Sequence, residues 1–129
     1  MPGGASSGFL PAALADRPLH FDALAGVGSM LGSGAVMVMD ETVNLVEATY
    51  TLVRFFAHES CGKCTPCRVG TRQLVDILER IIAGAGRKGD VELLENISRS
   101  MVGKTFCPLG DAAVNPVLST LQHFRPEYE

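Results

Sequence analysis

Residues 58–68 read His-Glu-Ser-Cys-Gly-Lys-Cys-Thr-Pro-Cys-Arg, which places Cys61, Cys64 and Cys67 at intervals of three. The fourth cysteine of the chain, Cys107, follows forty residues after Cys67 and precedes a proline. Four thiolates bind either zinc or an iron–sulfur cluster, so the number of cysteines alone does not distinguish these two kinds of site. Structural zinc sites usually take two ligands from each of two separate C-x-x-C pairs, whereas three closely spaced cysteines and a remote one suit a [4Fe–4S] cluster. The spacing therefore favours a [4Fe–4S] cluster over zinc or free thiols.

Several residues beside these cysteines are candidates to tune such a cluster. Gly62 lets the backbone pass close to it. The positive charges of Lys63, Arg68, Arg72 and Lys104 would favour the reduced, more negative state. The alternative is that these cations are ordinary solvated surface charges, since Lys and Arg are mostly exposed. Arg68 is the strongest candidate because it directly follows a cysteine at an expected helix start.

Composition limits the classes of protein to be considered. The chain has 129 residues, 47% hydrophobic and 19% charged, as expected for one globular domain and too few for a dinucleotide enzyme with its own substrate domain. Eleven Lys and Arg against fourteen Asp and Glu argue against a nucleic-acid partner. We expect no membrane-spanning segment, because no run of ~18 apolar residues occurs. With no secretory signal expected, we predict a cytoplasmic protein, or one peripheral to a membrane within a larger complex.

From residue 41 onward, apolar residues recur at spacings of three and four, which predicts helices. We expect four helices. The first spans Thr42–His58 with Asp40 or Thr42 as its N-terminal cap, and the second spans Val69–Ala83. The third is capped by Asp90, and the fourth starts between Leu109 and Asp111 and is kinked or restarted at Pro116. Helices of this length with short connections predict a small bundle. Both cysteine segments would then lie at one end of it.

Residues 1–40 differ from the rest, being rich in glycine and poor in charge. The apolar run Ala35–Met39 predicts one buried strand that ends at Asp40. The glycines at 26, 28 and 32 miss the G-x-G-x-x-G spacing by one position and lead into a strand, whereas a dinucleotide loop follows one. We therefore interpret them as turns and expect no FMN or NAD site in this chain.

The block from His58 to Arg68, with Cys107-Pro108-Leu109-Gly110-Asp111 after it, resembles the C-terminal part of the family of NADH dehydrogenase flavoprotein (51-kDa type) subunits. The same module occurs in NAD-reducing hydrogenases, bifurcating hydrogenases and NAD-dependent formate dehydrogenases. The resemblance covers essentially the whole chain. Gly3–Ser7 is similar to a loop in the family's β-grasp domain of the soluble-ligand-binding type.

This resemblance implies a mainly α fold, with a four-helix cluster-binding bundle at residues 41–129 preceded by a partial β-grasp segment at residues 1–40. It implies that Cys61, Cys64, Cys67 and Cys107 hold one [4Fe–4S] cluster, with Gly62, Lys63, Arg68 and Lys104 near it. The family's FMN- and NADH-binding domain has no counterpart here, so the resemblance places FMN and NAD(H) on a separate or missing N-terminal part.

The expected function is therefore an electron-transfer module of an NAD(H)-linked oxidoreductase complex. It would relay electrons between FMN on a nucleotide-binding polypeptide and the iron–sulfur centres of a further subunit. No catalytic residues are expected, and we predict that the chain alone does not oxidise NADH. The alternative is a zinc-stapled structural or adaptor domain without redox function, which metal analysis distinguishes.

Overall fold

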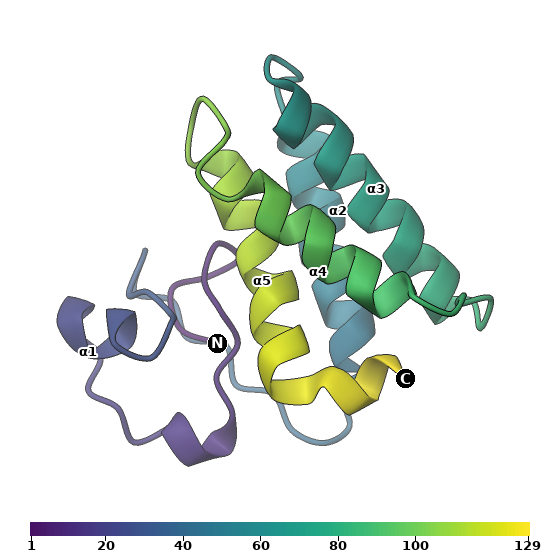
Figure 1. Ribbon diagram of the computed structural model, residues 1–129. Helices are drawn as coiled ribbons and strands as arrows, with labels where there is room; N and C mark the ends of the chain where they lie inside the picture. The colour runs from purple at the N-terminus through teal and green to yellow at the C-terminus, as the bar shows by residue number, and fades with distance from the viewer.

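Four helices build the main body of the chain in the computed structural model, which describes residues 1–129 (Figure 1). They are α2 (Leu45–Glu59), α3 (Thr65–Ile82), α4 (Asp90–Met101) and α5 (Leu109–Phe124). Each helix packs against the next one, and α5 closes the bundle against α2. The predicted four-helix bundle is confirmed.

The bundle is held together by the apolar faces that the sequence periodicity indicates. Side chains from all four helices, with Tyr128 of the C-terminal turn, form one buried core: Val46, Val53, Leu74, Val75, Ile77, Leu78, Leu94, Met101, Val114, Val117, Leu121 and Tyr128. Burying one such aliphatic side chain stabilises the fold by roughly 1.5–3 kcal/mol. The core runs along the bundle, so loops at either end rest on a packed scaffold.

The start of α2 differs from the prediction. Asn44 caps the helix, and its Oδ1 accepts the backbone N–H groups of Val46 and Glu47 at 3.0 and 3.1 Å. The predicted caps Asp40 and Thr42 are wrong, because Asp40 instead accepts from the N–H and hydroxyl of Thr42 in a separate turn. Side chains of this type compete for local backbone donors, and periodicity does not rank them.

The other helix starts place the cysteines. Helix α3 begins at Thr65, four residues before the predicted Val69, because Pro66 fits the first turn, where an N–H has no helical partner. Cys67 therefore lies on α3. Gly89, with φ of +92°, precedes α4, so Asp90 is its first residue and not its cap. Helix α5 begins at Leu109 as predicted and continues through Pro116, so the predicted restart does not occur.

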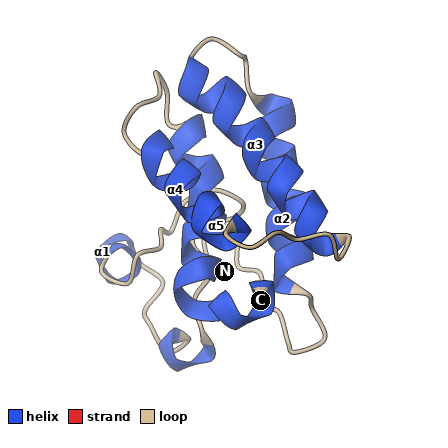
Figure 2. Ribbon diagram, turned by 45° about the vertical axis from the view of Figure 1, so that its right-hand side comes forward, coloured by secondary structure: helices blue, strands red, loops and turns tan.

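The N-terminal segment contains only a short 3-10 turn (Ala12–Leu14), α1 (Phe21–Ala25) and loops, and Figure 2 shows no strand. The predicted buried strand Ala35–Met39 is wrong: one isolated bridge joins Pro2 and Val36, and Val38 is 91% exposed. The backbone of the run is hydrogen-bonded only to Met1 and Gly3, and a stable sheet needs further strands or a covering layer. The β-grasp part of the predicted fold is not confirmed.

Hydrogen bonds join this segment to α5. Ser119 Oγ accepts the backbone N–H of Phe9 at 2.8 Å, and Asn115 Nδ2 donates to the carbonyl of Ser6 at 2.8 Å. Phe9 is buried at this contact. The segment therefore covers the side of α5, away from the loops that carry the cysteines (Figure 1). None of the helices combines the length and apolar character that a membrane crossing requires.

Candidate metal centre

The two loops that carry the cysteines lie at the same end of the bundle (Figure 1). One loop joins α2 to α3 and contains Cys61 and Cys64, while Cys67 lies in the first turn of α3. The other loop joins α4 to α5 and contains Cys107. The antiparallel packing expected from the sequence thus brings segments forty residues apart to one place. We call this end of the molecule the cysteine end.

The two loops approach each other at Cys64. The backbone N–H of Phe106, which precedes Cys107, faces the thiol of Cys64 and is the main cause that lowers the pKa of this thiol below its ordinary value. The N–H of Cys67 and the charge of Arg68 lower the pKa further, while partial burial acts the other way. N–H groups aimed at a sulfur favour the thiolate, the form that binds metal. Cys64 is therefore a candidate ligand between the two loops.

The remaining cysteines differ in exposure. Cys67 is buried, and its Sγ lies 3.2 Å from the hydroxyl of Ser60. Thr71 donates to the carbonyl of Cys67 at 2.7 Å and fixes this turn of α3. Cys61 and Cys107 are exposed, and all four cysteines are free thiols. One sulfur is therefore anchored in the bundle, while two lie on the surface of their loops.

Arg68 holds the first loop in shape. Its Nη1 donates to the carbonyl of Gly62 at 2.7 Å, across the loop from the helix to the turn. Gly62 has φ of +73°, in the left-handed region that glycine adopts without a steric penalty. Both residues were predicted near the site, and the structure brings them together. Lys63, Arg72 and Lys104 are exposed there, and the side chain of none of them makes a hydrogen bond.

The donor set fits an iron–sulfur cluster in its chemistry, with four free thiols on two adjacent loops. No three His, Cys, Asp or Glu side chains gather closely enough to hold a single metal ion. Thiolates bind zinc as well as clusters, so the chemistry of the four donors suits both kinds of site.

Sequence reasoning missed three residues of this region. Ser60 contacts Cys67, Thr105 donates to the carbonyl of Cys107 at 2.8 Å, and the backbone N–H of Phe106 faces the thiol of Cys64. Ser60 directly precedes the first cysteine, and this position could have indicated it. The approach of Phe106 depends on how two distant loops meet, and no local pattern reports that.

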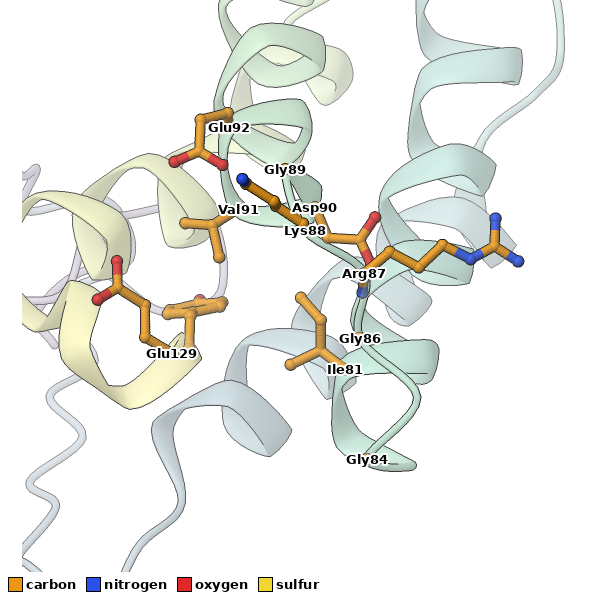
Figure 3. A pocket seen from close by; sticks show the side chains of 11 residues that line it. Ile81, Gly84, Gly86, Arg87, Lys88, Gly89, Asp90, Val91, Glu92 and Glu129 are labelled. Atoms are coloured by element: carbon orange, nitrogen blue, oxygen red, sulfur yellow. The ribbon is translucent and has the colours of Figure 1, made fainter.

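Two cavities lie away from the cysteines. One of about 450 Å³ is formed at the turn between α3 and α4, where Figure 3 shows Arg87, Lys88 and Asp90 around glycines. A second, of about 620 Å³, is mostly apolar and lies between the N-terminal segment and the start of α2. Neither includes a cysteine, so the candidate metal centre is a surface site of the loops.

Comparisons with known proteins identify the family of the chain. Residues 47–129 match the family model described as the NADH-ubiquinone oxidoreductase-F iron-sulfur binding region. The chain is 47% identical over 127 residues to the F subunit of NADH-quinone oxidoreductase from Mycobacterium tuberculosis, and 46% identical over 128 residues to that from Streptomyces coelicolor. These alignments cover 98% and 99% of this chain but only 28% of each relative.

Solved structures give the same result. NAD+-reducing [NiFe]-hydrogenase in the H2-reduced state contains a region that superimposes with a TM-score of 0.88 and 38% identity. The match covers the whole of this chain and 22% of that one. The air-oxidized state of such a hydrogenase matches with a TM-score of 0.89. The chain thus spans less than a third of the relatives and structures described.

Proposed function

Because the chain belongs to the family of NADH-ubiquinone oxidoreductase-F iron-sulfur binding regions, we propose that it holds one [4Fe–4S] cluster and relays electrons within an NAD(H)-linked complex. The donor would be FMN on a nucleotide-binding polypeptide, and the acceptor a further iron–sulfur subunit. The observation that carries the proposal is that the two cysteine loops lie at the same end of the bundle, where the N–H of Phe106 in one loop faces the thiol of Cys64 in the other.

The proposed ligands are Cys61, Cys64, Cys67 and Cys107. When bound, the cluster supplies a carrier that accepts and returns electrons. The chain's own residues position and polarise the sulfurs. Buried Cys67 is anchored by α3, Arg68 fixes the turn at Gly62, and the N–H groups of Phe106 and Cys67 face Cys64 and lower its pKa. Such donors, with the nearby charges of Lys63 and Lys104, stabilise added negative charge and raise a reduction potential.

We also propose a domain organisation for the chain. Residues 41–129 would form the cluster-binding domain, and all four bundle helices lie inside this range. Residues 1–40 would belong to a β-grasp unit, with their apolar run Ala35–Met39 at its unpaired edge. The FMN and NAD(H) sites would lie in parts of the complex that this chain does not match, in the cytoplasm, and the isolated chain would not oxidise NADH.

The test is assembly of the cluster from iron and sulfide under anaerobic conditions. The loaded protein should be brown, with broad absorption near ~400 nm that fades on reduction by dithionite. Single Cys→Ser changes at positions 61, 64, 67 and 107 should each reduce this absorption. Ala85→Ser, at an exposed site in the turn between α3 and α4, is the matched control and should change nothing. A colourless protein, or full absorption in all four variants, would contradict the proposal.

A further inference from the structure

Charge is distributed unevenly between the cysteine end and the rest of the chain. Residues 54–72 and 101–111, which form this end, contain five Lys or Arg and two Asp or Glu. All other residues together contain six Lys or Arg and twelve Asp or Glu. A bound cluster with its thiolates adds about two negative charges. Even then the cysteine end stays positive relative to a strongly acidic remainder.

The positive charges at this end are unpaired within the molecule. Every ion pair of the structure involves Arg80, Arg99 or Arg125, which lie elsewhere in the bundle. None involves the cations of the cysteine end, which are all exposed: Arg54, Lys63, Arg68, Arg72 and Lys104. Exposed charges without an internal partner are free to meet an acidic surface.

Apolar side chains are exposed among these charges. Phe106 is 80% exposed, Val102 48% and Val69 41%. Gly70, next to Val69, packs directly against Met101, next to Val102, so α3 and the end of α4 meet beside these two residues. Phe106 follows in the same loop as Val102, and its N–H faces the thiol of Cys64. An exposed aromatic with aliphatic neighbours and a basic rim is the composition of a protein-binding surface.

We propose that this patch, formed by Val69, Val102 and Phe106 with Lys63, Arg68 and Lys104 around it, docks an electron-transfer protein that has an acidic face around its own redox centre. The inference rests on the proposed function, since it assumes a cluster behind the patch. Phe106 is the central contact: its side chain is exposed, and its N–H faces the thiol of Cys64, a proposed ligand. Opposite charges steer the partner, and the apolar centre excludes water on contact.

The test uses the iron-loaded chain and an acidic plant-type ferredoxin as the probe, with basic cytochrome c as the opposite probe. Binding is measured at low and high salt. Ferredoxin should bind, and cytochrome c should bind at least about tenfold more weakly at low salt. The preference should largely vanish at about 1 M salt, where the screening length is about 3 Å.

Charge reversal locates the surface. Lys63→Glu with Lys104→Glu should weaken ferredoxin binding about tenfold or more at low salt. A second variant, Arg54→Glu with Arg72→Glu, changes charges on helices outside the loops and should weaken ferredoxin binding less. It replaces the first variant in the assay if the first variant loses iron. Arg17→Glu with Lys88→Glu makes the same change of charge at exposed sites away from the cysteine end, and should leave binding within about twofold. Phe106→Ser should weaken binding with the same salt dependence.

The outcomes separate the two proposals. A chain that holds no iron overturns the proposed function, whatever it binds. A loaded chain that binds both probes equally, or whose two charge-reversed pairs at the cysteine end behave like the control pair, overturns the docking surface alone. Tighter binding to vesicles of phosphatidylglycerol and phosphatidylcholine than to ferredoxin also overturns it, since the patch would then be a membrane contact.

Discussion

The two ends of the bundle are built in opposite ways. At the end opposite the cysteines, Arg80 and Asp90 form an ion pair at 2.6 Å, and the buried hydroxyls of Thr120 and Tyr128 lie 2.6 Å apart. At the cysteine end the thiols of Cys61 and Cys107 are exposed, and none of the cations is paired. At one end the polar groups are paired within the molecule, and at the other the thiols and cations are exposed without an ion-pair partner. The contrast indicates a scaffold at one end and a site for added groups at the other.

Truncating the shared core should have the largest effect on stability, because it weakens both ends together. Leu94 is completely buried among α3, α4 and α5. Leu94→Ala should lower the free energy of unfolding by about 2–5 kcal/mol, from lost burial and the cavity left behind. Urea unfolding of the metal-free chain measures this. Leu93→Ala, at the neighbouring exposed site, is the control, and an equal loss there would contradict the described core.

A change at the cysteine end should damage the site as well as the fold. A Cβ added at Gly110 would lie 2.8 Å from the Oγ1 and 3.0 Å from the Cβ of Thr105. Thr105 belongs to the loop that carries Cys107. Gly110→Ala should cost about 1–3 kcal/mol by overpacking and should also reduce cluster loading. Gly86→Ala is the control, because its Cβ would make only ordinary contact with Ile81 at 3.7 Å. Full loading of the Gly110 variant would show that this loop tolerates displacement.

The closed end should show itself in the pH dependence of stability. The Arg80 guanidinium, and then the N–H of Arg87, hold the pKa of Asp90 below its ordinary value of 3.8. A lowered pKa stabilises the fold above the ordinary value, and this contribution is lost as the pH falls through the folded-state value. Asp90→Asn should therefore destabilise the chain at pH 7, and the difference from the native chain should shrink as the pH falls below 3.8.

Urea unfolding of both proteins across that range gives the answer. Cluster loading at pH 7 should remain near the native level in Asp90→Asn, because the substitution lies at the end away from the cysteines. A difference in stability that grows as the pH falls below 3.8, or a loss of cluster with the fold intact, would contradict this role of the ion pair.

Removing one hydroxyl at the closed end should have the smallest effect. Tyr128 is buried, and its hydroxyl is hydrogen-bonded to Thr120. Tyr128→Phe should lower the free energy of unfolding by about 0.5–1.5 kcal/mol and leave cluster loading unchanged. Tyr50→Phe is the matched control and should cost less, because the Tyr50 hydroxyl makes an exposed hydrogen bond to Glu79 at 3.4 Å. A loss of cluster in Tyr128→Phe would mean that the two ends are coupled through the core.

Helical periodicity was enough to predict the bundle, because the apolar faces of four consecutive segments are regular from residue 45 onward. The cysteine spacing was enough to propose the ligands. Helix starts were less predictable, since Asn44, Asp40 and Thr42 are all competent caps, and tertiary packing chooses among them. The strand at Ala35–Met39 was predicted wrongly because an apolar run does not say whether partner strands are present.

The approach of Phe106 to Cys64 was beyond local reasoning altogether. It depends on the packing of α3 against α4 and α5, which sets how two loops forty residues apart approach each other. Sequence proximity did indicate Arg68 and Gly62, because their hydrogen bond spans only six residues. The placement of both cysteine loops at one end of the bundle was therefore predictable, whereas the approach of Phe106 to Cys64 required the fold.

The central claim is that the cysteine end holds an iron–sulfur cluster, and metal analysis of the chain loaded without oxygen tests it most directly. The measurement is the number of iron, acid-labile sulfide and zinc atoms per chain in the native protein and in Cys67→Ser. Our account predicts about four iron and four sulfide per native chain, and a large loss of both in the variant. One zinc per chain with no sulfide would contradict it.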